Sequence, residues 1–242
     1  MSEDRFRILT RDAIKYVAML AMLLNHIAEI FLTPGTVSYT VLRDSGYFTA
    51  ITMCYFLVGG YGYTRSKRQY AGRLLLFAVI SELPYCLAFD WVMLNMLCTL
   101  FICFLIIYVM KERQDSRYQH AIVAGLILLT GFRMDWGLLA PVFTVLFVKA
   151  GDSRRRLAAA WCEGVLLFGL LTVCSDLETM PFSMALMDAL GCMAAPAVSG
   201  VCILFLYNGK RAGHGRTFSK WFFYLFYPVH LTVLALLRIM IL

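Results

Sequence analysis

A few polar side chains stand inside long apolar stretches of this sequence, and their types suit proton transfer. His26 and Glu29 share one apolar run, Glu82 lies in another, and Tyr227 and His230 lie in the last. A charged group in the middle of a bilayer costs about 2.5–3.5 kcal/mol on insertion scales, so such residues usually serve a function. Histidine exchanges protons near neutral pH, and a carboxylate can orient its ring. We therefore predict a buried site for acid–base chemistry.

The spacing of these residues suggests one depth in the membrane. His26, Glu82 and His230 each lie about 9–12 residues, or roughly 14–18 Å, from the predicted cytoplasmic ends of their helices. His26 and Glu29 are three residues apart and share a helical face, so both are expected to face the bundle interior. A structural histidine that bonds a neighbouring helix remains an alternative explanation.

Two prolines fall next to the candidate residues. Pro84 follows Glu82 by two positions, and Pro228 lies between Tyr227 and His230. A proline inside a helix removes a backbone donor and typically produces a kink. Such a kink can open room beside a carboxylate or an imidazole, although a purely structural kink fits the same sequence.

A glycine-rich and basic stretch ends the second apolar run. Glycine lets a backbone approach a ligand closely, and basic side chains bind phosphates. We predict that this stretch binds the phosphates of a cofactor, although close helix packing followed by a topogenic basic cluster gives the same pattern. Its residues are Gly59, Gly60, Gly62, Arg65, Lys67, Arg68 and Arg73.

The elements that carry these residues are those of a membrane protein. Of 242 residues, 61% are hydrophobic and 15% are charged, against roughly 25% charged in an ordinary soluble domain. Lipid must cover part of so much apolar surface. The net charge of +7 comes in clusters between apolar runs, which favours membrane topology over nucleic-acid binding. The eight cysteines show no metal-ligand spacing, so we expect neither a metal site nor a disulfide framework.

We predict an all-α fold, a single domain over residues 1–242 that forms a polytopic membrane helix bundle of about nine transmembrane helices. All but Arg43, Arg133 and Arg238 of the 22 lysines and arginines then lie on one side, which predicts an N-in, C-out topology. The fifth and sixth segments are short and need a thin bilayer or a tilted, re-entrant geometry. The expected segments are 14–32, 46–63, 71–89, 91–110, 118–132, 136–148, 157–174, 187–206 and 221–242.

Several separated motifs resemble the TraX family, polytopic inner-membrane proteins associated with N-terminal acetylation of conjugative pilin. The resemblance covers nearly the whole chain, and many members have Asp where this chain has Asn25. Asparagine can hydrogen-bond to a histidine but cannot pair with its charge. The motifs are Leu9-Thr10 through Lys15, Met22 to His26, Arg73 to Tyr85, Asp135-Trp136-Gly137, Tyr207 to Lys210, and Phe226 to His230.

The resemblance implies a bacterial inner-membrane enzyme that transfers an acetyl (acyl) group from cytoplasmic acetyl-CoA to an amine or hydroxyl acceptor such as a pilin N-terminus. In that interpretation His26 is the general base, Glu29 or Glu82 orients it, and Tyr227 or His230 donates to the oxyanion.

The expected partners are the acceptor (a protein N-terminus, a small molecule or a glycan) and membrane lipids, with no nucleic acid. A proton-coupled transporter and a non-catalytic membrane assembly protein for conjugation remain the alternatives.

Overall fold

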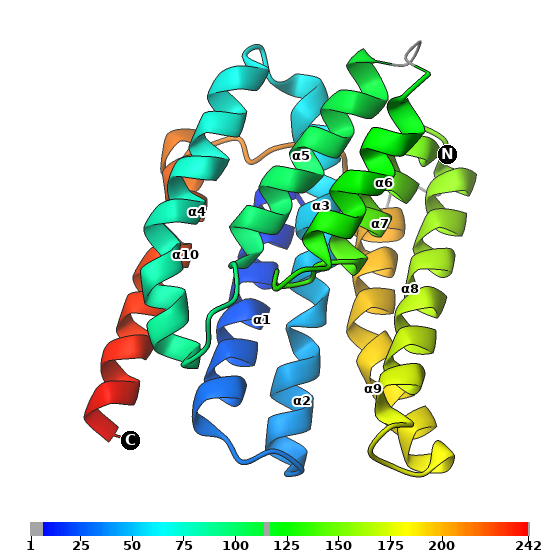
Figure 1. Cartoon of the computed structure of the whole chain (residues 1–242). Helices are drawn as coiled ribbons and strands as arrows, with labels where there is room; N and C mark the ends of the chain where they lie inside the picture. The colour runs from blue at the N-terminus through cyan, green and yellow to red at the C-terminus, as the bar shows by residue number, and fades with distance from the viewer. Residues whose placement is uncertain (1–6, 114–116, 242) are drawn as a thin grey trace. The chain divides into compact units, whose positions relative to one another are not determined.

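The computed structural model describes residues 7–113 and 117–241, and the secondary structure of these parts is helical apart from two isolated β-bridges (Figure 1). Arg5, one of the predicted cytoplasmic charges, lies outside the described residues. The described helices are α1 (Arg11–Phe31), α2 (Val37–Ser45), α3 (Tyr47–Tyr63), α4 (Lys67–Phe89), α5 (Met96–Glu112), α6 (Gln119–Thr130), α7 (Leu139–Ala150), α8 (Arg154–Asp176), α9 (Phe182–Val201), the π-helix η2 (Cys202–Leu206) and α10 (Arg216–Ile241).

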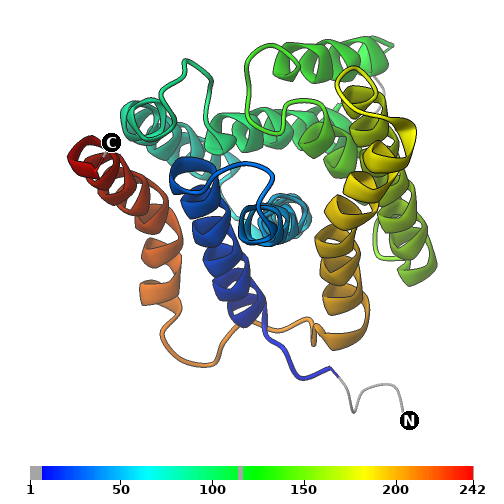
Figure 2. The same ribbon diagram turned by 90° about the horizontal axis from the view of Figure 1, so that it is seen from below.

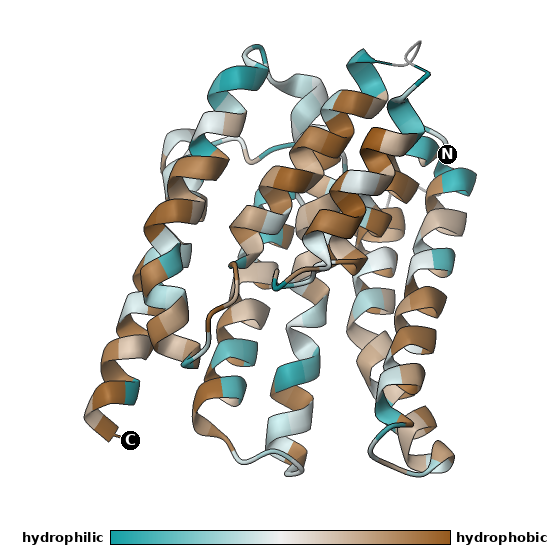
Figure 3. Cartoon of the chain, viewed as in Figure 1, coloured by the Kyte–Doolittle hydropathy of each residue, from teal (hydrophilic) through white to brown (hydrophobic). Residues whose placement is uncertain are grey.

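The all-α prediction is confirmed, and each predicted apolar segment contains a helix. One helix was not predicted: α2 forms in a stretch that the sequence analysis left between two segments. In the described part of the chain, five helices are long and apolar enough to cross a membrane: α1, α4, α8, α9 with η2, and α10. Figure 3 shows the pattern, with apolar residues along the helices and polar residues gathered at many of their ends. The chain is therefore a multi-pass membrane protein, while the count of nine spans and the topology stay predictions.

By backbone contacts the chain divides into two compact units, whose boundaries fall inside α3, near the end of α7 and just before α10. Unit 1 comprises residues 1–52 and 149–214, and unit 2 comprises residues 53–148 and 215–242. The prediction of a single domain stays a prediction.

In unit 1, α1 packs on α2, α2 on α9, and α9 on α8, and the α8–α9 pair is visible from below in Figure 2. Small residues allow the close approach of α8 and α9. A Cβ on Gly200 would lie 2.6 Å from Cδ1 of Trp161, and a Cβ on Gly169 would lie 2.2 Å from Sδ of Met193. The indole of Trp161 also donates a 3.0 Å hydrogen bond to the carbonyl of Pro196. Close packing and interhelical hydrogen bonds hold membrane helices together in this way.

In unit 2, α4 packs against both α10 and α5, and α5 packs against α6. The ring of Phe77 stacks on Tyr224 with centroids 5.0 Å apart. Both α4 and α10 continue through the prolines near the candidate residues, Pro84 and Pro228. These two helices therefore carry Glu82, Tyr227 and His230 on continuous helical frames.

Candidate functional site

His26 lies in α1, which is capped at its start by Thr10, whose hydroxyl accepts from the amide of Ala13 at 3.3 Å. The histidine is 15 residues past Arg11, or about 22 Å along the helix axis. Its relative exposure is only 6%. α1 thus carries a buried imidazole deep within an apolar span.

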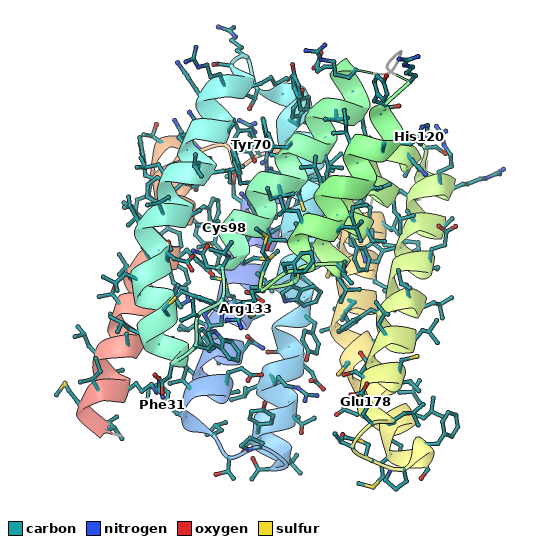
Figure 4. The ribbon with its side chains drawn as sticks, in the orientation of Figure 1. Phe31, Tyr70, Cys98, His120, Arg133 and Glu178 are labelled. Carbon is teal, nitrogen blue, oxygen red and sulfur yellow. The ribbon has the colours of Figure 1, made fainter. Side chains whose placement is uncertain are left out.

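Glu29 differs from the expectation that it would share the buried face of His26, because it is exposed. It lies in the last turn of α1, near Phe31, which Figure 4 labels at that end of the helix. There Tyr39 of α2 donates a 3.2 Å hydrogen bond to Oε2 of Glu29. Because α1 ends at Phe31, two residues after Glu29, the carboxylate contacts the start of α2 instead of the core.

Asn25, next to His26, joins α1 to the following helices. Its side-chain amide donates a 2.7 Å hydrogen bond to the carbonyl of Arg43. It also packs so closely on Gly46 that a Cβ there would lie 2.3 Å from Cβ of Asn25. The sequence analysis singled out this position only through the resemblance, and the contact to Arg43 gives it a structural role.

An ion-pair network that hydropathy did not predict lies beside this contact. The guanidinium of Arg43 lies 2.8 Å from Oδ1 of Asp44 and 3.1 Å from Oδ1 of Asp188 on α9. The thiol of Cys192 lies 3.4 Å from the same guanidinium. Arg43 was assigned to a loop on hydropathy alone, whereas an aspartate inside the predicted segment 187–206 was a signal that a cation must lie nearby.

Two motifs of the resemblance lie together in unit 1. The amide of Leu9 donates to the carbonyl of Leu206 at 2.9 Å, and the amide of Asn208 donates to the carbonyl of Leu9 at 3.0 Å. Asp12, in the first turn of α1, accepts from the amide of Ala212 at 2.7 Å. The segment after η2 is therefore bound to the start of the helix that carries His26.

Glu82, in unit 2, is tied to the start of α5. Its Oε2 accepts hydrogen bonds from the side-chain amide of Asn95 at 2.6 Å and from the backbone amide of Asn95 at 3.2 Å. The thiols of Cys86 and Cys98 lie 3.7 and 3.9 Å from the same carboxylate. Polar neighbours thus surround this intramembrane carboxylate.

Tyr227 and His230 are both buried in α10. Nδ1 of His230 lies 2.8 Å from the carbonyl oxygen of Phe226. Because a carbonyl only accepts, Nδ1 carries the hydrogen, and Nε2 of the neutral ring is then an acceptor. His230 can therefore donate to an oxyanion from Nε2 only when it is protonated, whereas the hydroxyl of Tyr227 is a donor without a change of charge.

The predicted phosphate-binding glycines Gly59, Gly60 and Gly62 lie near the end of α3, within the predicted segment 46–63. In a helix, backbone amides in these positions bond to carbonyls of the preceding turn. A Cβ on Gly59 or on Gly62 would meet nothing within 4 Å. A ligand could therefore contact an open helix surface at these two glycines.

The predicted basic residues differ in their contacts with the rest of the protein. Nζ of Lys67 donates to the carbonyls of Tyr61 and Thr64, at 2.5 and 3.0 Å, and so closes the end of α3. The guanidinium of Arg73 lies over the rings of Tyr70 and Tyr224. Arg65 and Arg68 are exposed.

His26 and Glu29 belong to unit 1, and Glu82, Tyr227, His230 and the predicted phosphate-binding residues belong to unit 2. That these residues form one site stays a prediction.

Comparison with known proteins gives a consistent result over almost the whole chain. The sequence model of the family described as TraX protein matches residues 10–238. A probable fimbrial assembly protein FimC, serogroup H1, of Dichelobacter nodosus is 29% identical over 234 residues, which cover 92% of this chain and 93% of the relative. No solved structure matches this chain.

Proposed function

Because the chain belongs to the TraX family, we propose that it is a membrane-embedded acetyltransferase that uses cytoplasmic acetyl-CoA. Its acceptor is an amine or a hydroxyl, such as the N-terminus of a pilin. The family's association with pilin acetylation and the fimbrial assembly relative both support this substrate class. The location that follows is the bacterial inner membrane, where a multi-pass protein has access to donor and acceptor.

The observation that carries the proposal is the burial of His26, 6% exposed, within an apolar helix of membrane-spanning length. A neutral imidazole can accept a proton from an attacking amine. A buried ionisable residue in such a helix also needs a function to offset its cost.

The chemistry requires one base and one oxyanion donor. His26 accepts a proton from the acceptor amine while the amine nitrogen attacks the thioester carbonyl. The C–S bond then breaks. The departing thiolate takes the proton from the imidazolium, so free CoA and the acetylated acceptor are the products. Tyr227 is the proposed oxyanion donor, with protonated His230 as the second candidate, and the orienting roles of Glu29 and Glu82 stay predictions.

Acetyl-CoA brings several phosphates, for which Arg65, Lys67, Arg68 and Arg73 are the proposed partners. Arg65 and Arg68 are the exposed members of this set. Charge-assisted contacts bind phosphate strongly, and exposed ones weaken with salt. The uncovered surface at Gly59 and Gly62 is the proposed path of the thin pantetheine arm, while Gly60 is buried and could contribute only to helix packing.

The test of the proposal compares two histidines. Protein in lipid vesicles is given radiolabelled acetyl-CoA and a synthetic pilin N-terminal peptide, and labelling of the peptide is measured. His26→Ala and His26→Gln are expected to reduce labelling at least 100-fold, in line with the contribution of general bases. His120→Ala is the matched control, because His120 is exposed on α6 (Figure 4). Full labelling by a folded His26→Ala variant would overturn the proposal.

Donor binding separates the enzyme from a transporter or an assembly protein. The enzyme is expected to bind acetyl-CoA saturably, with affinity that falls with added salt and in the Arg65→Ser/Arg68→Ser variant. Arg155→Ser/Arg156→Ser is the control, because these arginines are also exposed basic residues. Absence of saturable binding would favour one of the alternatives.

A further inference from the structure

Two helices, α6 and α7, are much shorter than a membrane crossing, and α5 is at the lower limit of one. α4 has 23 residues, α5 has 17, and α6 and α7 have 12 each. At 1.5 Å per residue these helices span about 35, 26 and 18 Å, against a hydrocarbon thickness of about 30 Å.

Basic residues stand at one end of each short helix and at the start of α4. Lys67 and Arg68 begin α4, and Lys111 lies in the last turn of α5. Arg117 comes just before α6, and Lys149 lies in the last turn of α7. If these charges mark the cytoplasmic surface, as the positive-inside rule predicts, the far ends of α5, α6 and α7 stop inside the bilayer.

At these far ends two non-helical segments, 90–95 and 131–138, are joined by backbone hydrogen bonds, and we call them the junction. The amide of Leu94 donates to the carbonyl of Arg133 at 2.7 Å, and the amide of Asp135 donates to the carbonyl of Leu94 at 2.9 Å. The hydroxyl of Thr99 donates to the carbonyl of Asp135 at 2.6 Å. Figure 1 shows the junction part of the way along α10.

Segment 131–138 of the junction is exposed and carries a charge at a depth where lipid disfavours both a loop and a charge. Arg133 is exposed, and Figure 4 shows it on the loop between α6 and α7. In the same segment, Phe132 and Leu138 are 75% and 46% exposed. Non-helical backbone occurs at membrane depth only where protein buries it or water reaches it. Because the segment is exposed, protein does not bury it, and an exposed arginine in hydrocarbon would be costly. Access of water is the explanation that is left.

We propose that outer water reaches the junction of unit 2, and that a polar acceptor arrives through this water rather than sideways from lipid. The junction includes Asn95, whose amide is bonded to Glu82. Asn95 alone therefore separates water at the junction from the carboxylate of Glu82. The acceptor part of this inference rests on the proposed acetyl transfer, whereas the wet junction does not.

Cysteine labelling tests the wet junction. In a variant whose eight native cysteines are replaced by serine or alanine, single cysteines are placed at Phe132, Arg133 and Leu138. The matched controls are Val79→Cys and Leu83→Cys on α4, which are 65% and 68% exposed and lie about 18 and 24 Å from Lys67 along the helix. A charged, membrane-impermeant thiosulfonate is added to the outside of intact vesicles.

Labelling of the three junction cysteines is expected to be at least 10-fold faster than labelling of the two α4 controls. All five variants should react fully with N-ethylmaleimide after solubilisation in detergent, which shows that each thiol is intact. Rates at the junction as slow as those of the controls would overturn the proposal, and so would labelling only from the cytoplasmic side.

The acceptor route needs a second measurement. Arg133→Cys is modified with a bulky thiosulfonate, and acetyl transfer to the synthetic pilin peptide is measured before and after. A several-fold rise in KM for the peptide, with unchanged acetyl-CoA binding, is expected. Fast labelling with unchanged transfer would overturn the acceptor route and leave the acetyltransferase proposal standing. If the junction is labelled fast but the protein has no transfer activity, the proposed function fails and the wet junction stands.

Discussion

The side-chain amide of Asn95 donates a 2.6 Å hydrogen bond to Oε2 of Glu82. The same asparagine caps α5, since its Oδ1 accepts from the amide of Leu97 at 2.9 Å. Glu82, chosen from the sequence as a candidate to orient a histidine, is therefore also a link between α4 and the start of α5. Any catalytic role of this carboxylate must operate with Asn95 bound to it.

We expect Asn95→Ala to destabilise the protein by about 2–3 kcal/mol, because it removes a helix cap and the side-chain donor to the carboxylate of Glu82, which keeps the backbone amide of residue 95. It also removes the 2.8 Å bond from the side chain to the carbonyl of Ala78. The measurement is the thermal unfolding midpoint in detergent. Ser175→Ala, at an exposed position in the last turn of α8, serves as the control and should leave the midpoint unchanged. An unaltered midpoint in Asn95→Ala would show that the network adds nothing to stability.

A second prediction concerns Asn25→Asp, the change toward the residue found in many family members. Asparagine donates to the carbonyl of Arg43 at 2.7 Å, and a carboxylate would instead set two acceptors against each other. We expect a loss of about 1–3 kcal/mol of stability, measured by unfolding in detergent. Peptide acetylation by the folded fraction tests the effect on His26 separately. A stabilised Asn25→Asp protein would contradict this account of the position.

The third prediction concerns the ion pair between Arg43 and Asp188, whose atoms lie 3.1 Å apart. A double-mutant cycle with Arg43→Gln and Asp188→Asn is expected to give a coupling energy of about 1–2 kcal/mol, because both groups are partly shielded from water. Unfolding midpoints of the wild type, both single variants and the double variant supply the cycle. Additive effects of the two substitutions would mean that the pair contributes no coupling.

A fourth prediction separates the glycines that pack from those that face open space. Gly59→Ala/Gly62→Ala should fold normally, because added Cβ atoms meet nothing within 4 Å and alanine favours a helix by about 1 kcal/mol. The same variant should bind acetyl-CoA more weakly if the pantetheine arm follows this surface. Gly46→Ala is the contrast: its Cβ would lie 2.3 Å from Asn25, so it should destabilise the fold. Unchanged acetyl-CoA affinity in the double variant would remove Gly59 and Gly62 from the proposed donor site.

Hydropathy predicted the helices well, because a membrane segment must satisfy its backbone hydrogen bonds internally and must be apolar. It failed for α2, which contains Arg43 and Asp44. A window of mean hydropathy assigns such a stretch to a loop, whereas Asp188, which pairs with Arg43, lies far away in the sequence. Helical periodicity likewise predicted a buried face for His26 but not the exposure of Glu29, because periodicity ignores where a helix ends.

The sequence by itself determined that the chain is an all-α membrane protein, which residues are ionisable within apolar runs, and the family to which it belongs. These properties follow from local composition and from motifs in order along the chain. Only the tertiary structure decided that Asn95 holds Glu82, that Arg43 pairs with Asp188, and that Arg133 and Leu94 meet at the ends of short helices. Such contacts depend on which helices pack together, and the free energy of packing is shared among residues distant in sequence.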